Sequence, residues 1–123
     1  MSLLTATAVD CTVSRGTNKI LRFQINDLNT GSVYNLTGHT IKLLLSKNRV
    51  SDDSILSITG NITNPTQGWV EFGFVGEDTE SLMARAYDAD IIVTEITSGD
   101  RWLAFQGSIA VTPTIGEEVQ ENG

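Results

Sequence analysis

"AYDADIIVTEITSGDRWLAFQGSIAVTP", residues 86–113, reads as two β-strands joined by a turn, and it carries apolar residues on both faces of that hairpin. Apolar and polar residues alternate with the period of two that is typical of half-buried strands. A three-residue loop at 98–100 would pair Val93 with Phe105 and gather the large apolar residues on one face. The residues expected on this core face are Tyr87, Ala89, Ile91, Val93, Leu103, Phe105, Gly107, Ile109 and Val111.

The other face of the same hairpin holds a second apolar set, which includes Ile92, Ile96, Trp102 and Ala104. Ile96 is expected opposite Trp102, as a cross-strand pair with no core behind it. Exposed apolar patches usually mark interaction sites. We therefore expect Trp102→Ala to lower partner binding more than folding stability. The residues expected at this partner interface are Ile96, Trp102 and two further outward-facing apolar residues, Trp69 and Leu44.

The rest of the chain repeats the alternation and shows almost no helical periodicity. Besides the hairpin, strands are expected over residues 6–13, 19–26, 39–46, 54–58 and 68–75. Turn-forming residues separate these segments, and a helical turn is expected only within 77–85. About seven short strands with this spacing are typical of a sandwich or barrel. The sequence predicts an all-β, single antiparallel β-sandwich over residues 1–115 and an acidic tail at 116–123.

Charge and composition exclude several classes of partner. The 123 residues carry a net charge of −7 at pH 7, so the phosphate backbone of a nucleic acid would be repelled. There is no apolar run long enough for a transmembrane helix, so no membrane partner is expected. The N-terminus lacks the features of a signal peptide, and Cys11 is the single cysteine. We therefore expect synthesis in a reducing cytoplasm.

The groups needed for catalysis are few. His39 is the single histidine, and together with Cys11 it cannot supply the four ligands typical of a structural zinc site. Asp88 and Asp90 share one side of a strand, where paired acids more often mark a solvated face or a partner contact than a glycosidase centre. Calcium binding stays open at Asp27, Asn29, Asp52 and Asp53, although no ligand spacing there matches an established loop. We expect no catalytic, cofactor or metal site and no enzymatic activity.

The segments "ILRFQINDLNTGSVYNLTGHTIKLLLS", "GWVEFGF" and "LMARAYDADIIVTE", followed by the end of the hairpin, occur in a characteristic order over about residues 15–114. This order resembles the small immunoglobulin-like β-sandwich modules of tailed-bacteriophage virions, notably the N-terminal domain of phage baseplate upper proteins. In the corner 36–38, the leucine is expected to fill the sandwich edge and the glycine to permit the turn. Tyr87 is expected to bury its ring and to form a hydrogen bond with a backbone group through its hydroxyl. The matching positions are Phe23, Asp27, Gly31, Leu36, Thr37, Gly38, Gly68, Val70, Tyr87, Val111 and Pro113.

The resemblance implies a non-enzymatic structural protein of the bacteriophage virion, synthesised in the host cytoplasm. Its expected partners are other virion proteins, and it is expected as a homo-oligomer or in many copies. Two locations stay open, the tail with its baseplate and the capsid, where the chain would be a decoration (cement) protein. An alternative of a different class is a carbohydrate- or cell-surface-binding module that stacks sugars on Trp69 or Trp102.

Overall fold

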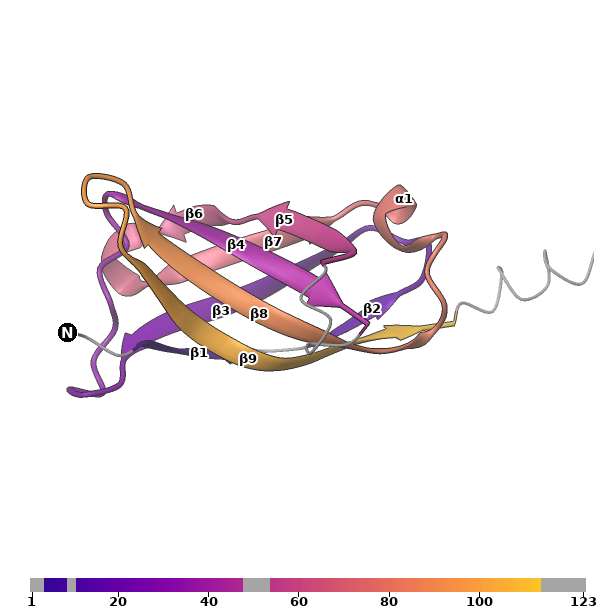
Figure 1. Cartoon of the computed structure of the whole chain (residues 1–123), viewed down its shortest axis with the longest axis horizontal. Helices are drawn as coiled ribbons and strands as arrows, with labels where there is room; N and C mark the ends of the chain where they lie inside the picture. The colour runs from indigo at the N-terminus through magenta and orange to yellow at the C-terminus, as the bar shows by residue number, and fades with distance from the viewer. Residues whose placement is uncertain (1–3, 9–10, 48–53, 114–123) are drawn as a thin grey trace, which may run out of the picture.

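The computed structural model describes residues 4–8, 11–47 and 54–113, and these residues form an all-β structure of two sheets (Figure 1). The strands are β1 (Leu4–Ala8), β2 (Thr12–Ser14), β3 (Lys19–Asp27), β4 (His39–Ser46), β5 (Leu56–Thr59), β6 (Asn61–Asn64), β7 (Trp69–Phe74), β8 (Arg85–Glu95) and β9 (Arg101–Thr112). A 3-10 turn, η2 (Pro65–Gln67), precedes β7, and a helical turn, α1 (Gly76–Thr79), follows it. The helical turn begins one residue before the segment in which it was expected.

One sheet has four strands in the order β1-β3-β7-β6, and the other has five in the order β2-β9-β8-β4-β5. Neighbouring strands run antiparallel, except that β2 runs parallel to β9, which corrects the prediction of a wholly antiparallel sandwich. The β3–β4 segment and the β8–β9 turn lie at one end of the molecule, which we call the loop end. Helical turn α1 and the end of β9 lie at the other (Figure 1).

The core lies between the two sheets and follows from the alternation in the sequence. In β3 the three apolar residues at odd positions are buried, and Arg22 between them points outward to an ion pair with Glu71. Phe23 contacts Phe72 of its own sheet and Phe105 of the opposite sheet edge-on, with ring centroids 5.7 and 5.3 Å apart. The prediction of an all-β chain with two packed layers is confirmed.

Two expectations about single strands were wrong. The strand predicted at 6–13 is two strands, because β1 joins the four-stranded sheet and β2 joins the five-stranded sheet. The segment between the expected strands 54–58 and 68–75 contains an edge strand, β6, which was not expected because most of its residues are polar. Gly60 lies where the chain passes from β5 to β6, and a Cβ atom there would be 2.6 Å from Cγ2 of Val70. The predicted acidic tail at 116–123 and residues 48–53, between the expected strands 39–46 and 54–58, lie outside the described residues.

The β8–β9 hairpin has a different register from the predicted one. Thr94 pairs with Arg101, and the Glu95 N–H donates to the Asp100 carbonyl at 2.8 Å, so the loop has four residues instead of three. Its last residue, Gly99, has a φ of 77°, the left-handed conformation that closes such a loop. Farther along the hairpin Phe105 pairs with Ile91, not with Val93.

A β-bulge reconciles this turn with burial of the core residues. Without a bulge, the four-residue loop would direct Gln106 and Ser108 inward. The register shifts between Ile91 and Ile92, which leaves Ala104 as an extra residue and returns Phe105 and the apolar residues after it to the inner face. Ala104 is itself buried, although an outward position was predicted for it.

The four-residue loop exchanges two of the predicted faces on the turn side of the bulge. Trp102 pairs with the buried Val93 and packs against the core, so its predicted outward position opposite Ile96 was wrong. Leu103, predicted in the core, points outward and is 44% exposed. Because Trp102 contacts the core, the expectation that Trp102→Ala spares stability no longer follows.

The corner residues lie as the sequence indicates. Leu36 is buried, and Gly38 has a φ of 79° just before β4. The ring of Tyr87 is buried at the start of β8, and its hydroxyl donates to the Met83 carbonyl oxygen at 2.7 Å. This hydrogen bond ties the segment after α1 to the five-stranded sheet.

We expect Tyr87→Phe to lower the free energy of unfolding by about 1 kcal/mol, because it deletes this hydrogen bond and leaves the Met83 carbonyl without its donor. Urea denaturation of the two proteins measures the difference. Tyr34→Phe is the control for loss of a hydroxyl at a more exposed tyrosine. Equal free energies for Tyr87→Phe and the wild type would contradict this role of the hydroxyl.

Candidate interaction surfaces

The outward-facing side of the five-stranded sheet is the first candidate surface, and we call it the five-stranded outer face. Leu103 is its most exposed large apolar side chain, and Leu44 and Ile92 beside it are half-buried. A hollow of about 320 Å³ lies on this face. The residues that line it are Thr40, Lys42, Leu44, Ile92, Thr94 and Arg101.

Strand pairing orders this face into four rows that cross β4, β8 and β9. From the loop end the rows are Thr40-Thr94-Arg101, Lys42-Ile92-Leu103, Leu44-Asp90-Gln106 and Ser46-Asp88-Ser108. The two cations, Lys42 and Arg101, occupy the first two rows, and the two acids, Asp88 and Asp90, occupy the last two. The three large apolar residues fall in the two middle rows, so the face has a positive half, an apolar middle and a negative half.

A cluster of aromatic rings at the loop end is the second candidate. The ring of His39 lies 5.3 Å from that of Tyr34 and 6.2 Å from that of Trp102, measured between centroids. Nδ1 of His39 is 3.0 Å from the Thr37 carbonyl oxygen, which can only accept, so Nδ1 carries the proton. In neutral His39, Nε2 therefore accepts from the Tyr34 hydroxyl at 3.2 Å. His39 thus orients the side chain of Tyr34.

The environment of Tyr34 favours the protonated phenol. Partial burial raises the pKa of Tyr34, and the carboxylates of Glu95 and Asp27 raise it further. This agrees with a hydroxyl that donates to His39. Ile96 lies beside the cluster and is 62% exposed, and its N–H donates to the Gly38 carbonyl at 3.0 Å. The exposed position predicted for Ile96 is confirmed.

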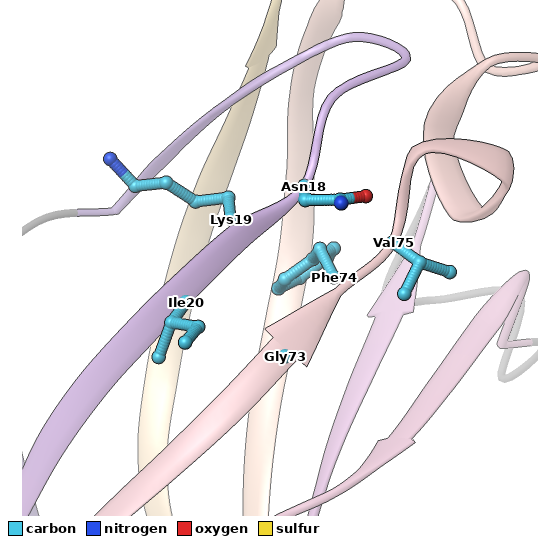
Figure 2. A pocket seen from close by; sticks show the side chains of 6 residues that line it. All are labelled: Asn18, Lys19, Ile20, Gly73, Phe74 and Val75. Carbon is cyan, nitrogen blue, oxygen red and sulfur yellow. The ribbon is translucent and has the colours of Figure 1, made fainter.

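A third surface lies on the four-stranded sheet, at the end opposite the loop end, where a hollow of about 510 Å³ opens. Figure 2 shows Ile20 on β3 and Val75 after β7 on either side of this hollow, with no side chain at Gly73 between them. Ile20 is 61% exposed and Val75 is 48% exposed. Asn18 Oδ1 accepts from the Gly76 N–H at 2.8 Å and fixes the rim. Sequence reasoning missed this hollow, although the alternation in β3 places Ile20 outward.

Trp69 points outward from the same sheet and is half-buried. It pairs with Gln24 on β3 and with Asn64 on β6, so its neighbours are polar. The outward positions predicted for Trp69 and Leu44 are confirmed by the strand registers. The structure places Leu44 and Trp69 on different sheets and Trp102 at the loop end, so the four predicted interface residues do not form one patch.

The described residues contain no group of three or more histidine, cysteine, aspartate or glutamate side chains placed to hold a metal ion. The Asp27 carboxylate, one of the possible calcium ligands, instead accepts from the Asn29 N–H at 2.8 Å within its own turn. Asp52 and Asp53 lie outside the described residues. Among the described residues there is also no helix with the length and hydropathy needed to span a membrane.

No family model matches the sequence, and no curated protein matches it. Sequence reasoning singled out some residues of the surfaces described above, among them Leu44, Ile92 and Trp102, but not the others that complete these surfaces. Leu103 was missed because the loop has four residues instead of three, and the arrangement of Lys42 with Arg101 was missed because it depends on how β4, β8 and β9 pair.

Proposed function

We propose that this chain is a non-enzymatic structural protein of a bacteriophage virion, built as an immunoglobulin-like module that docks onto other virion proteins. The observation that carries the docking proposal is the five-stranded outer face, where Leu103, Leu44 and Ile92 lie close together in the two middle rows and charged residues lie beside them. Protein interfaces combine an apolar centre with a polar rim in this way.

The strand order supports an immunoglobulin-like module. The first part of the chain contributes β1 to one sheet and β2 to the other, and β2 runs parallel to the last strand. The bond from the Tyr87 hydroxyl to a carbonyl four residues upstream has the geometry of the tyrosine corner found in immunoglobulin-like sandwiches. These two features support the immunoglobulin-like part of the proposal.

Purified virions of the phage that encodes this chain provide the test of the proposal. Mass spectrometry of particles separated into tail and capsid fractions should detect the chain, and the fraction that contains it separates the tail and baseplate from capsid decoration. A chain abundant in the lysate and absent from both fractions would overturn the proposal.

A variant links the proposed surface to incorporation. Leu103→Glu places a charge in the apolar middle, and we expect it to reduce incorporation into particles by about tenfold or more. The same change should alter the free energy of unfolding by no more than about 0.5 kcal/mol, because the side chain is exposed. Thr112→Glu on the same strand, outside the four rows, is the control, and normal incorporation of Leu103→Glu would exclude this face.

Trp69 favours a second candidate function, binding of a carbohydrate. Its outward ring lies among Gln24 and Asn64, which supply donors and acceptors beside a stacking platform. Intrinsic tryptophan fluorescence titrated with a panel of glycans tests this candidate. A shift that Trp69→Ala abolishes would support glycan binding, and the absence of any shift would leave docking on protein as the function.

A further inference from the structure

We propose that the outer face of the four-stranded sheet binds a neutral oligosaccharide, which lies along β7 from the ring of Trp69 to the hollow beside Gly73. The inference rests on the second candidate function in one respect, namely that Trp69 stacks a sugar. What it adds is a longer site with a second binding position, and the chemistry of the ligand that fits it. The two sheets pack face to face, so this site and the five-stranded outer face lie on opposite sides of the molecule (Figure 1).

The first observation is a glycine inside a strand. Glycine lowers the stability of a strand, and it commonly marks a left-handed backbone, a bulge or a close approach by another group. Gly73 has no positive φ, and it pairs with Ile20 in a regular register. A Cβ atom there would meet nothing within 4 Å, so no part of the described chain approaches it from outside. The reason that remains is the approach of a ligand.

The hollow beside Gly73, about 510 Å³ in volume, has aliphatic walls. Figure 2 shows Ile20 and Val75 on either side of the open strand position, and both side chains are exposed. Lys19 lies at the rim, and its side chain points away from Gly73 (Figure 2). Burial of a methyl group against such walls is favourable. The hollow therefore suits the methyl group of an acetamido sugar or a deoxy sugar.

An ion pair lies between the hollow and Trp69. Nε and Nη2 of Arg22 both donate to Oε2 of Glu71, at 3.0 and 2.5 Å. Within the described residues, Nη1 of Arg22 and Oε1 of Glu71 therefore have no partner. A hydroxyl group donates one hydrogen bond and accepts others, so a sugar hydroxyl can accept from Nη1 and donate to Oε1.

Trp69 forms the other end of the site. It is half-buried, and it is not among the described residues that pack against the core. Its cross-strand neighbours are Gln24 and Asn64, and Nε2 of Gln24 donates to the Gln67 carbonyl at 3.1 Å, which orients this amide. An aromatic surface with a few oriented polar groups is typical of a ligand site. It fits a sugar ring, which has an apolar face and an edge of hydroxyl groups.

The charge of the face indicates a neutral ligand. The chain has a net charge of −7, but the residues that the registers place outward on this sheet include one cation and one anion, which pair with each other. Without a net charge, the face attracts no ion over a distance, so hydrogen bonds and apolar contacts determine what binds. The outward residues are Thr5, Thr7, Ile20, Arg22, Gln24, Asn26, Asn61, Asn64, Trp69, Glu71 and Gly73.

The length of the site indicates an oligosaccharide. Trp69 and Gly73 are four residues apart on one strand, so about 13 Å separates them, which exceeds the width of one sugar ring. The face is open and leaves much of the ligand in water. We therefore expect weak binding by one copy, with a dissociation constant on the order of 0.1–1 mM. Several copies in one particle would raise the overall affinity.

NMR titration of the ¹⁵N-labelled full chain tests the site. The probes are neutral monosaccharides and tetrasaccharides, with and without acetamido and deoxy groups, and one sialylated tetrasaccharide. A neutral tetrasaccharide should shift both the indole N–H of Trp69 and the amide of Gly73, while the indole of Trp102 stays unchanged. It should bind at least about tenfold more tightly than its monosaccharide, because it contacts both ends of the site. The sialylated probe should bind no more tightly than the neutral ones.

Gly73→Leu fills the hollow, and the open space there allows this variant to fold. It should bind the tetrasaccharide at least about fivefold more weakly and leave binding of the monosaccharide at Trp69 unchanged. Thr5→Leu is the matched control, because it adds the same side chain on the same face, on β1 and outside the site. Glu71→Ala removes the acceptor in the middle and should weaken binding of the tetrasaccharide by about fivefold. The NMR spectrum of each variant establishes that it is folded.

Three results would overturn the proposal. The first is the absence of any shift at Gly73 with every probe at about 10 mM, well above the expected dissociation constant. The second is equal affinity for the monosaccharide and the tetrasaccharide, or wild-type affinity in Gly73→Leu. The third is binding of the sialylated probe alone, which would exclude a neutral ligand.

These outcomes separate the inference from both candidate functions. Shifts confined to Trp69 that Gly73→Leu leaves unchanged would mean that Trp69 alone binds the sugar, so the extended site fails and the second candidate function stands. A chain that binds no probe, and whose Leu103→Glu variant is lost from particles, would remove both glycan proposals and leave docking on virion proteins in place.

Discussion

Phe23→Ala should lower the free energy of unfolding by about 3–5 kcal/mol, a large part of the stability of a domain of this size. Phe23 is fully buried at the centre of β3. Its ring contacts Phe72 within its own sheet and Phe105 across the core, so its loss leaves a cavity that both sheets border. Strands paired on both sides hold β3 in place and limit how far that cavity can collapse. Guanidinium denaturation followed by tryptophan fluorescence measures the loss.

Leu103→Ala is the control for this prediction, because it deletes a large apolar side chain on the outside of the sheet. We expect it to lower the free energy of unfolding by less than about 1 kcal/mol, since the side chain is 44% exposed. Equal losses for the two variants would place Leu103 in the core and contradict the bulge in β9. A loss below about 1 kcal/mol for Phe23→Ala would contradict the description of the core itself.

The strands that face the core are the part of the fold that the sequence predicts well. In β3, β4 and β7 one face carries nearly all the large apolar residues, and the other face mixes polar residues with one large apolar residue (Ile20, Leu44 or Trp69). The first face is therefore the one that is buried. The local pattern is then sufficient, and the expected and observed strands differ by at most one residue at either end.

The hairpin shows where local reasoning fails. Near the turn the inward-facing residues of β9 occupy even positions, and farther along the strand they occupy odd positions. A register without a bulge would leave one of these two sets facing outward. The chain instead keeps the four-residue loop that Gly99 closes and inserts Ala104 as an extra residue. Neither the length of the loop nor the bulge leaves a simple mark in the alternation, so the exchange of Trp102 and Leu103 could not be predicted from the pattern.

The candidate interface depends on pairing between distant strands. Lys42 and Arg101 are far apart in the sequence, and they share one half of a face because β8 lies between β4 and β9. Asp90 lies beside Leu44 for the same reason. The sequence supplies the residues, but the separation of charge along the face appears only when both registers are known.

Gly68→Ala should be the second strongly destabilising change, with a loss of about 3 kcal/mol or more from backbone strain and steric overlap together. Gly68 has a φ of 74°, and a Cβ atom there would lie 2.5 Å from the Ile25 carbonyl oxygen and 2.9 Å from that of Tyr34. The obstructing atoms belong to the backbone. The Ile25 N–H donates to the Gly68 carbonyl at 2.8 Å, and the Tyr34 N–H donates to the Ile25 carbonyl at 2.9 Å, so the Ile25 oxygen cannot move away without breaking these bonds.

Gly31→Ala separates the two contributions to this loss. Gly31 has nearly the same φ, 76°, but a Cβ atom there would meet nothing within 4 Å. We expect this control to lose only the cost of a left-handed backbone, about 1–2 kcal/mol, and thermal and urea denaturation of both variants give the difference. That difference measures how closely the backbones at Gly68, Ile25 and Tyr34 approach one another. Equal losses would mean that these segments lie farther apart, and Tyr34 would then lose the backbone support that places its ring against His39.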